Sequence, residues 1–228
     1  MLVISDIHGY KEGLLSLLRM AGYNPASDQL VLLGDYIEAD KPATWGILDT
    51  IMKLVRNGAL ALPGNHELKL VGMLRKRGAR GERLRRYIRW INKLPPYYIN
   101  GSYLFVHAGI RPGVPLKNQS LRDLTEIRES FYSQTLPDLE EDLQLEPSRR
   151  TPYGDMRVIF GHTPSFKLGA PPGTIWKHSR LVSIDTGAKH GCRLTLLDLT
   201  GGVAYSCASK PGYRASDYRA DSVRHMQL

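Results

Sequence analysis

Residues 59–67 read Ala-Leu-Ala-Leu-Pro-Gly-Asn-His-Glu, a short apolar run that ends abruptly in a polar turn. The same order occurs twice earlier, where residues 2–5 lead into Asp-Ile-His-Gly and residues 30–33 stop at Gly34-Asp35. Apolar residues at helical spacing follow each turn. Strand, polar loop and helix repeated in this way predict an α/β protein whose site lies at the carboxyl ends of its strands.

The second half of the chain is predicted to be mainly strand. Asn100-Gly101 separates two apolar runs, and this dipeptide is the strongest short signal for a β-hairpin. The strands predicted in this half lie at residues 97–99, 103–106, 158–160, 181–184, 194–199 and 203–206. A helix is predicted over residues 121–134. Residues 135–156 are acidic, contain proline and are expected to be irregular.

Length and composition bound the domain organisation. The chain has 228 residues, of which 42% are hydrophobic and 23% charged, as is ordinary for a folded protein. We expect one domain over residues 1–209. Residues 210–228 are polar and lack an apolar period, so we expect a loose tail there, or an arm for a partner.

The expected compartment is the cytoplasm. No apolar run is long enough to cross a bilayer, so no membrane partner is expected. Residues 2–4 lead directly into Ser5-Asp6-Ile7-His8, a motif that we expect to be part of the folded domain, so no signal peptide is expected there. Cys192 and Cys207 are the two cysteines, and in a reducing compartment we expect them to be buried free thiols.

The charge balance is strongly basic. The chain carries 31 Lys and Arg against 22 Asp and Glu, and a formal charge of +9 attracts phosphorylated or polyanionic partners. Basic residues crowd the segment 75–89, which we interpret as a solvated helical face, with a funnel for a polyanionic substrate as the alternative. A nucleic-acid site would also need aromatic side chains that stack on bases between these charges. Tyr87 and Trp90 are the aromatics near the segment, and the helical period assigns Tyr87 to the core, which disfavours a nucleic-acid partner.

Five loops, each directly after a strand, carry side chains that bind hard or borderline metal ions. They are Asp6-x-His8, Gly34-Asp35, Gly64-Asn65-His66-Glu67, His107-Ala108-Gly109 and Gly161-His162. Residues i and i+2 at an extended strand end project to the same side, which suits the Asp-x-His spacing. Carboxylate, imidazole and amide oxygen together favour Mn²⁺, Fe or Zn²⁺ over Ca²⁺.

In this order the motifs resemble the calcineurin-like metallophosphoesterases, and within them the protein phosphatases of the PPP family and their bacterial relatives. The resemblance covers about residues 1–200, and Gly64-Asn65-His66-Glu67 is its most specific match. It implies two mixed β-sheets packed face to face, with helices on both outer sides. It also implies a first metal on Asp6, His8 and Asp35, and a second on Asp35, Asn65, His107 and His162.

The resemblance also implies a mechanism. Two divalent ions about 3.5–4 Å apart hold one hydroxide between them and clamp the phosphoryl oxygens for in-line attack. Mn²⁺ is the expected ion, with Fe, Zn²⁺ and Mg²⁺ as alternatives. His66 is the candidate general acid for the leaving oxygen, held and polarised by the carboxylate of Glu38. Asn65 and Arg128 are the candidate phosphate-binding residues.

The sequence departs from the family pattern at several positions. Glu38 stands where the family has an aspartate, and Ala39 stands where it has a phosphate-binding arginine. Arg128 resembles a later phosphate-binding arginine, although a surface arginine paired with glutamates remains the other reading, and Arg111 is a weaker substitute. Asp185 is either a turn residue or a group that orients a ligand. The histidines that match no family position, and are assigned structural or surface roles, are His178, His190 and His225.

Three functions fit these observations. The first is a serine/threonine protein phosphatase, with phosphotyrosine as a possible further substrate. The alternative in the same superfamily is a dinucleoside polyphosphate hydrolase such as a diadenosine tetraphosphatase, or a phosphodiesterase, which would have greater use for the basic charge. The third is a non-catalytic binding module, which the complete set of predicted ligands disfavours. The substrate is accordingly a phosphorylated protein, a small phosphoester or a nucleotide.

Overall fold

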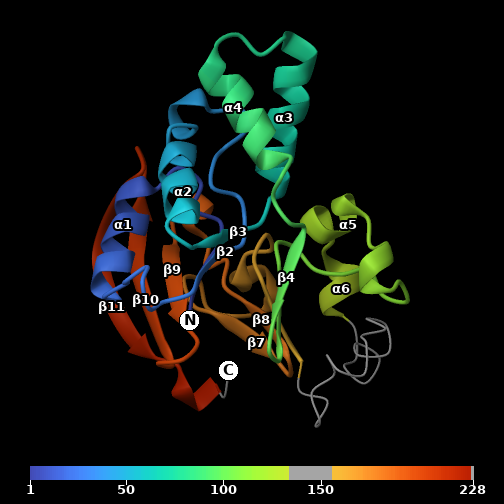
Figure 1. Cartoon of the computed structure of the whole chain (residues 1–228). Helices are drawn as coiled ribbons and strands as arrows, with labels where there is room; N and C mark the ends of the chain where they lie inside the picture. The colour runs from blue at the N-terminus through green and yellow to red at the C-terminus, as the bar shows by residue number, and fades with distance from the viewer. Residues whose placement is uncertain (134–155, 227–228) are drawn as a thin grey trace.

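The computed structural model describes residues 1–133 and 156–226, so the predicted irregular segment at 135–156 lies, apart from Met156, outside the described residues (Figure 1). The strands form two mixed sheets with helices on their outer sides, which confirms the expected fold class. In the described parts of the chain, no helix is both long and apolar enough to cross a membrane.

Within residues 1–133 and 156–226, the first sheet has six strands in the order β11-β10-β9-β1-β2-β3. Their bounds are β1 (Leu2–Ile4), β2 (Leu30–Leu32), β3 (Leu60–Ala61), β9 (Arg193–Asp198), β10 (Val203–Lys210) and β11 (Arg214–Ser222). β1, β2 and β3 are parallel, and β9 is antiparallel to β1. The loops that follow β1, β2 and β3 therefore leave from the same edge of the sheet.

The second sheet has five strands in the order β4-β5-β6-β8-β7. Their bounds are β4 (Tyr97–Asn100), β5 (Tyr103–Val106), β6 (Arg157–Phe160), β7 (Trp176–His178) and β8 (Leu181–Ser183). β4 and β5 form the hairpin predicted around Asn100-Gly101. β5, β6 and β8 are parallel, so their carboxyl ends also share one edge.

Three apolar cores hold the layers together. Val3, Phe105 and Ile159 belong to the core between the two sheets, where strands of both contribute fully buried side chains. A second core joins the first sheet to α1 (Lys11–Met20), α2 (Ile47–Arg56), α3 (Asn65–Arg77) and α4 (Glu82–Ile91). A third joins the second sheet to α5 (Leu121–Glu126) and α6 (Glu129–Tyr132). Short 3₁₀ helices are η1 (Pro42–Thr44), η2 (Leu116–Asn118), η4 (Ser165–Leu168), η5 (Ala188–His190) and η6 (Arg224–Met226).

The basic segment forms two helices. α3 and α4 pack side by side and project together at the top of Figure 1. The break falls at Gly78 and Gly81, which adopt φ values of +73° and +87° that favour glycine. Tyr87 is 1% exposed, as its helical period predicted.

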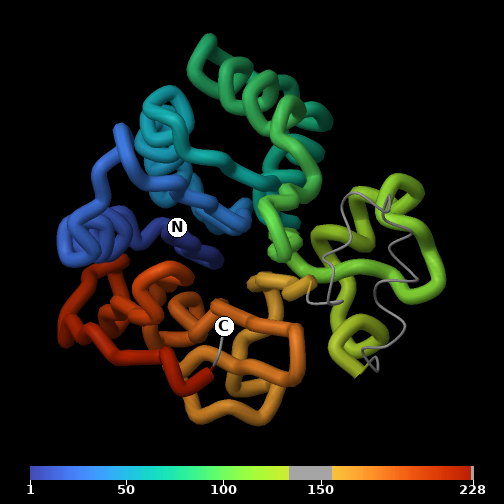
Figure 2. The backbone as a smooth tube through the Cα atoms, turned by 60° about the horizontal axis from the view of Figure 1, so that its bottom comes forward, coloured from blue at the N-terminus to red at the C-terminus, as the bar shows by residue number. Residues whose placement is uncertain are grey.

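The C-terminal stretch is not a loose tail over residues 214–222. These residues form β11, which pairs with β10 from Val203 opposite Ser222 to Lys210 opposite Arg214. The pairing depends on backbone hydrogen bonds, and most β11 side chains are exposed, so no apolar period marks this edge strand. Figure 2 shows the C-terminal strands (red) beside the helix α1 (blue), which contacts β10 and β11. The assignment of residues 1–209 to one domain stays a prediction.

Both cysteines are free thiols, as expected. Cys207 is buried in β10, and burial raises the pKa of its thiol to about 11. Cys192, just before β9, is half-buried rather than buried.

Gly109 gives a test of the packing behind the His107 loop. A Cβ added there would lie 2.3 Å from Cδ1 of Phe131, so Gly109→Ala should lower the free energy of unfolding by about 1–3 kcal/mol. At Gly72, inside α3, an added Cβ would meet nothing within 4 Å, so Gly72→Ala should stabilise by about 0.5–1 kcal/mol. Urea unfolding of both variants measures the contrast, and equal effects would contradict it.

Candidate active site

The predicted metal ligands meet in space because their loops leave the strands at one edge. Asp6 and His8 follow β1, Asp35 follows β2, and Asn65 follows β3. The second sheet adds two histidines, since His107 follows β5 and His162 follows β6. All these side chains except half-buried Asn65 are buried.

The structure groups these side chains into two triads that share one carboxylate. Asp6, His8 and Asp35 offer ligand atoms within 4.8 Å of one another, and so do Asp35, His107 and His162. Asp35 therefore lies between the triads, which is where the sequence placed a bridging ligand. A third group of the same compactness is His8, Glu38 and His66.

His107 supplies a test of whether a cation fits. Its Nδ1 lies 2.9 Å from the carbonyl oxygen of Leu33, so the neutral ring donates there and leaves a lone pair on Nε2. That Nε2 lies 3.3 Å from Oδ1 of Asn65 and 3.5 Å from Oδ1 of Asp35. Three acceptor atoms, from His107, Asn65 and Asp35, thus lie close together, and a cation is a group that such an arrangement accommodates.

The other two histidines agree with that conclusion. Nε2 of His8 lies 3.8 Å from Oδ1 of Asp6 and 3.9 Å from Oδ2 of Asp35. Nε2 of His162 is buried and has no hydrogen-bond partner in the part of the chain that the structure describes. A buried polar atom without a partner is costly, so the donor set fits a metal ion.

Burial favours the neutral forms of His107 and His162, which are the forms that metal binding requires. It lowers the pKa of His107, and it lowers the pKa of His162 to about 3 with help from the nearby charges of His107 and Arg128. At Asp35, burial and then the charges of Asp6 and Glu67 raise the carboxyl pKa well above its usual range. The site thus holds more negative charge than it can stabilise alone.

Four of the predicted ligands have strained backbones. Asp6, His8, Asp35 and His162 have φ values of 51°, 46°, 53° and 64°, a region that non-glycine residues seldom occupy. Each such residue costs on the order of 1–3 kcal/mol and persists only where its surroundings hold it. Here the amides of Asp6 and His8 donate to the carbonyls of Gly34 and Asp35, at 3.1 and 2.9 Å. The loops therefore fix one another in the conformation that gathers the ligands.

Glu67 joins two of the ligand loops. Its carboxylate is fully buried and accepts four backbone N–H bonds, from Asp35 at 2.8 Å, Tyr36 at 2.9 Å, Ile37 at 3.3 Å and Gly64 at 2.9 Å. Burial still raises its pKa, although these bonds oppose the shift. The sequence marked Glu67 only as the last letter of a motif and gave it no role.

The surroundings of His66 differ from the expected carboxylate contact. Its Nδ1 accepts the backbone N–H of Ala39 at 3.0 Å, whereas Oε2 of Glu38 is 3.5 Å away. The neutral ring therefore carries its proton on Nε2. Burial first, and then the charges of His8 and Lys189, lower the pKa of His66 to about 4.

Lys189 is the residue that the sequence reasoning missed. Its Nζ lies 2.9 Å from Oε2 of Glu38 and 2.9 Å from Nε2 of His66. η5 presents this lysine just after the turn of Asp185-Thr186-Gly187, in which Asp185 accepts the N–H of Gly187 at 3.0 Å. That turn was visible in the sequence, but the partners of Lys189 lie more than 120 residues away.

A cavity of about 190 Å³ opens onto the ligand cluster and has a cationic rim. Arg128, Lys167 and Lys189 line it, and Arg128 also donates to the carbonyl of His162 and the hydroxyl of Thr163. Asp185, buried and lining the cavity too, is both a turn residue and a neighbour of the cluster.

Two other residues singled out from the sequence can be placed relative to this cavity. His190, assigned a structural or surface role, is exposed and lines it. Arg111 does not line it and instead pairs with Asp123 on the exposed face of α5.

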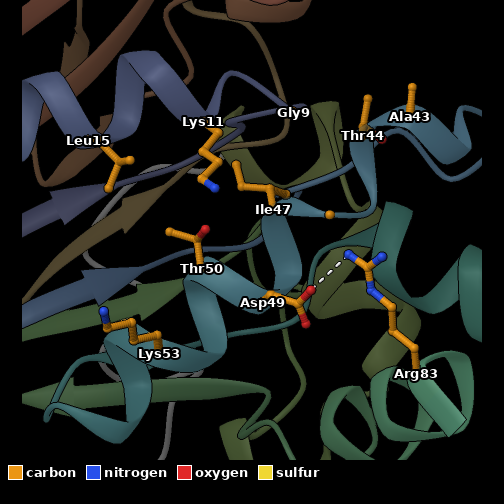
Figure 3. A pocket seen from close by; sticks show the side chains of 11 residues that line it. Gly9, Lys11, Leu15, Ala43, Thr44, Ile47, Asp49, Thr50, Lys53 and Arg83 are labelled. Atoms are coloured by element: carbon orange, nitrogen blue, oxygen red, sulfur yellow. Dashed lines mark hydrogen bonds and ion pairs between the residues drawn. The ribbon is translucent and has the colours of Figure 1, made fainter.

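A larger cavity lies elsewhere. It measures about 660 Å³ and is lined by residues of α1 and α2 such as Lys11 and Lys53, but by none of the predicted metal ligands. Figure 3 shows Arg83 reaching Asp49 there, at 2.8 Å. In the described residues, none of the basic side chains at 75–89 lines the 190 Å³ cavity, which favours the solvated-face interpretation.

Comparison with known proteins gives a consistent picture. The family model for calcineurin-like phosphoesterases matches residues 1–195. A symmetrical bis(5'-nucleosyl)-tetraphosphatase of Aromatoleum aromaticum is 31% identical over 48% of this chain, but the match spans only 44% of that enzyme. The asymmetrical bis(5'-nucleosyl)-tetraphosphatase PrpE of Bacillus velezensis is 26% identical over 97% of this chain and 98% of its own length.

Two solved structures share the fold. One is a protein proposed to be a diadenosine tetraphosphatase, with a TM-score of 0.68 and 23% identity over 92% of this chain and 94% of that one. The other is a cold-active protein-tyrosine phosphatase of a psychrophilic Shewanella, with a TM-score of 0.63 and 16% identity over 97% of this chain and 79% of that one. At these identities the likeness is one of fold alone.

Glu67→Gln tests the junction between the ligand loops. The amide keeps the shape but loses the charge and one acceptor, so the free energy of unfolding should fall by about 1.5–3 kcal/mol. Glu82→Gln is the matched control, because Glu82 is exposed and should contribute nothing measurable. Denaturant unfolding of both variants decides the point, and an unchanged midpoint for Glu67→Gln would show that the loops are held by other contacts.

Proposed function

This chain belongs to the calcineurin-like phosphoesterase family, and on that premise we propose that it hydrolyses phosphate esters with two divalent metal ions. The observation that carries the proposal is the pair of buried triads that share Asp35. Carboxylate, imidazole and amide donors favour Mn²⁺, with Fe, Zn²⁺ and Mg²⁺ as alternatives.

We assign the ligands as follows. One ion would be held by Asp6, His8 and Asp35, and the other by Asp35, Asn65, His107 and His162. When bound, such ions polarise the phosphoryl group and supply a nucleophile at neutral pH. The converging acceptors around Nε2 of His107 support this assignment.

The remaining residues would act on the substrate itself. His66 presents Nε2–H to the cavity and would donate a proton, or a hydrogen bond, to the leaving oxygen. Glu38 lies beside both His8 and His66 and would orient them through charge. Arg128 and Asn65 line the cavity and would bind the phosphoryl oxygens.

The proposed substrate is a dinucleoside polyphosphate. Two features support it over a phosphoprotein, namely the names of the tetraphosphatase relatives and the three cationic side chains at the cavity. This reverses the order suggested by the sequence, which placed a serine/threonine protein phosphatase first. A substrate with several linked phosphates uses more positive charge than a single phosphomonoester does.

A substrate panel tests the proposed function. With Mn²⁺, kcat/KM for diadenosine tetraphosphate should exceed kcat/KM for a phosphoserine peptide by at least about tenfold, and a strong chelator should abolish both. Asp35→Asn should remove one negative charge from both metal sites, so it should abolish turnover and lower the metal content below two ions per chain. Full activity in the chelator would overturn the metal mechanism, and preference for the peptide would restore the phosphatase reading.

The role of His66 gives a separate prediction. If its Nε2–H serves the leaving oxygen, His66→Asn should lower kcat by about 10²–10⁴ for an alkyl phosphate. The loss should be much smaller for nitrophenyl phosphate, whose leaving group hardly needs a proton. Steady-state kinetics on the two esters measures the difference. Equal losses would show that His66 binds phosphate or supports a metal instead.

A further inference from the structure

We infer that a second cavity, of about 470 Å³, beside the metal-ligand cluster is the subsite for one nucleoside end of a polyphosphate substrate. The inference rests on the proposed function and extends it to the part of the substrate that does not react. The first cavity, at about 190 Å³, is smaller than the roughly 300–1,000 Å³ of most ligand pockets, so a large substrate must continue outside it.

The two cavities adjoin each other. His8, Lys189 and His190 line both of them, so a chain of phosphates that starts at the metal ligands reaches the second cavity past Lys189. On its far side the second cavity is lined by Pro211, Gly212 and Tyr213, which form the turn between β10 and β11. The polar C-terminal hairpin therefore supplies a wall of the site.

Two tyrosines give this cavity an aromatic surface. Tyr10 and Tyr213 both line it, and their rings meet edge to face with centroids 5.4 Å apart. Tyr10 is buried, whereas Tyr213 is half-buried and keeps part of its ring free. Ser209 of β10, which is close to Tyr10, donates its hydroxyl to the carbonyl of Ala188 at 2.7 Å. The hairpin, Tyr10 and η5 are thus held as one wall.

Lys189 is suited to carry phosphate between the cavities. Nδ1 of His66 accepts the N–H of Ala39, so Nε2 of the neutral His66 ring carries a proton and is a donor. The ammonium group of Lys189, which faces Nε2, also has only donors. The 2.9 Å contact of Lys189 with Nε2 is then donor against donor, while its bond to Glu38 is a favourable one. Its remaining N–H groups have a better partner in a phosphate oxygen.

The charge and shape of the second cavity favour a nucleotide over a peptide. Lys41 and Lys189 outnumber the one carboxylate there, that of Glu38. Gly191 and Gly212 present bare backbone, since a Cβ at either would meet nothing within 4 Å. A planar base can approach such backbone closely and stack on an aromatic ring, a contact worth about 1–3 kcal/mol.

Tyr213→Ala tests the subsite. We expect the ratio of kcat/KM for diadenosine tetraphosphate to kcat/KM for nitrophenyl phosphate, which has no nucleoside, to fall about tenfold. Tyr213→Phe keeps the ring and should restore the ratio. Tyr218→Ala is the matched control, because Tyr218 is exposed on β11 and lines neither cavity, so its ratio should not change. Thermal unfolding of each variant shows that the fold is kept.

The outcomes separate the subsite from the proposed function. An unchanged ratio in Tyr213→Ala would overturn the nucleoside subsite, even where the wild type hydrolyses both esters and so supports the proposed function. An equal loss on a phosphoserine peptide would also overturn it, because the wall would then serve any substrate. If the wild type hydrolyses no phosphoester, that result would instead overturn the proposed function itself.

Discussion

The buried carboxylate of Glu67 holds the loop that carries Asp35 against the loop that carries Asn65. Its two oxygens accept four backbone N–H groups, three from the loop after β2 and one from the loop after β3. A reciprocal bond runs from the N–H of His66 to Oδ1 of Asp35, at 2.9 Å. Glu67, buried between the two loops, therefore holds Asp35 and Asn65 close to each other, as the proposed metal site requires.

Without a cation, that arrangement raises the free energy of the folded chain. Asp6 and Asp35 lie within one compact group, four of the predicted ligands have positive φ values, and Nε2 of His107 faces an oxygen of Asn65. A ligand that binds only the folded chain stabilises it by mass action. Metal binding and folding are thus expected to be linked here, because a cation would offset the negative charges that the fold holds close together.

Much of this cluster could be predicted from the sequence, because each proposed ligand follows a strand in its own short motif. Asp6, His8, Asp35, His107 and His162 needed only local patterns and the rule that parallel strands end at one edge. Lys189 could not be found in that way, since Glu38 and His66 lie far from it in the chain and no motif joins them. β11 was missed for another reason, because an exposed polar edge strand carries no apolar period.

Lys189 supplies positive charge at a site where Ala39 replaces the arginine of the family pattern. Ala39 is fully buried, its N–H donates to Nδ1 of His66, and its methyl side chain carries no charge for a phosphate. The positive charge comes instead from η5, on the other side of His66. A lysine is a flexible point charge without the planar fork of an arginine, so it fixes one phosphoryl group less rigidly. A site built in this way can follow a chain of phosphates from one cavity to the next, which a rigid clamp on a single phosphate would not do.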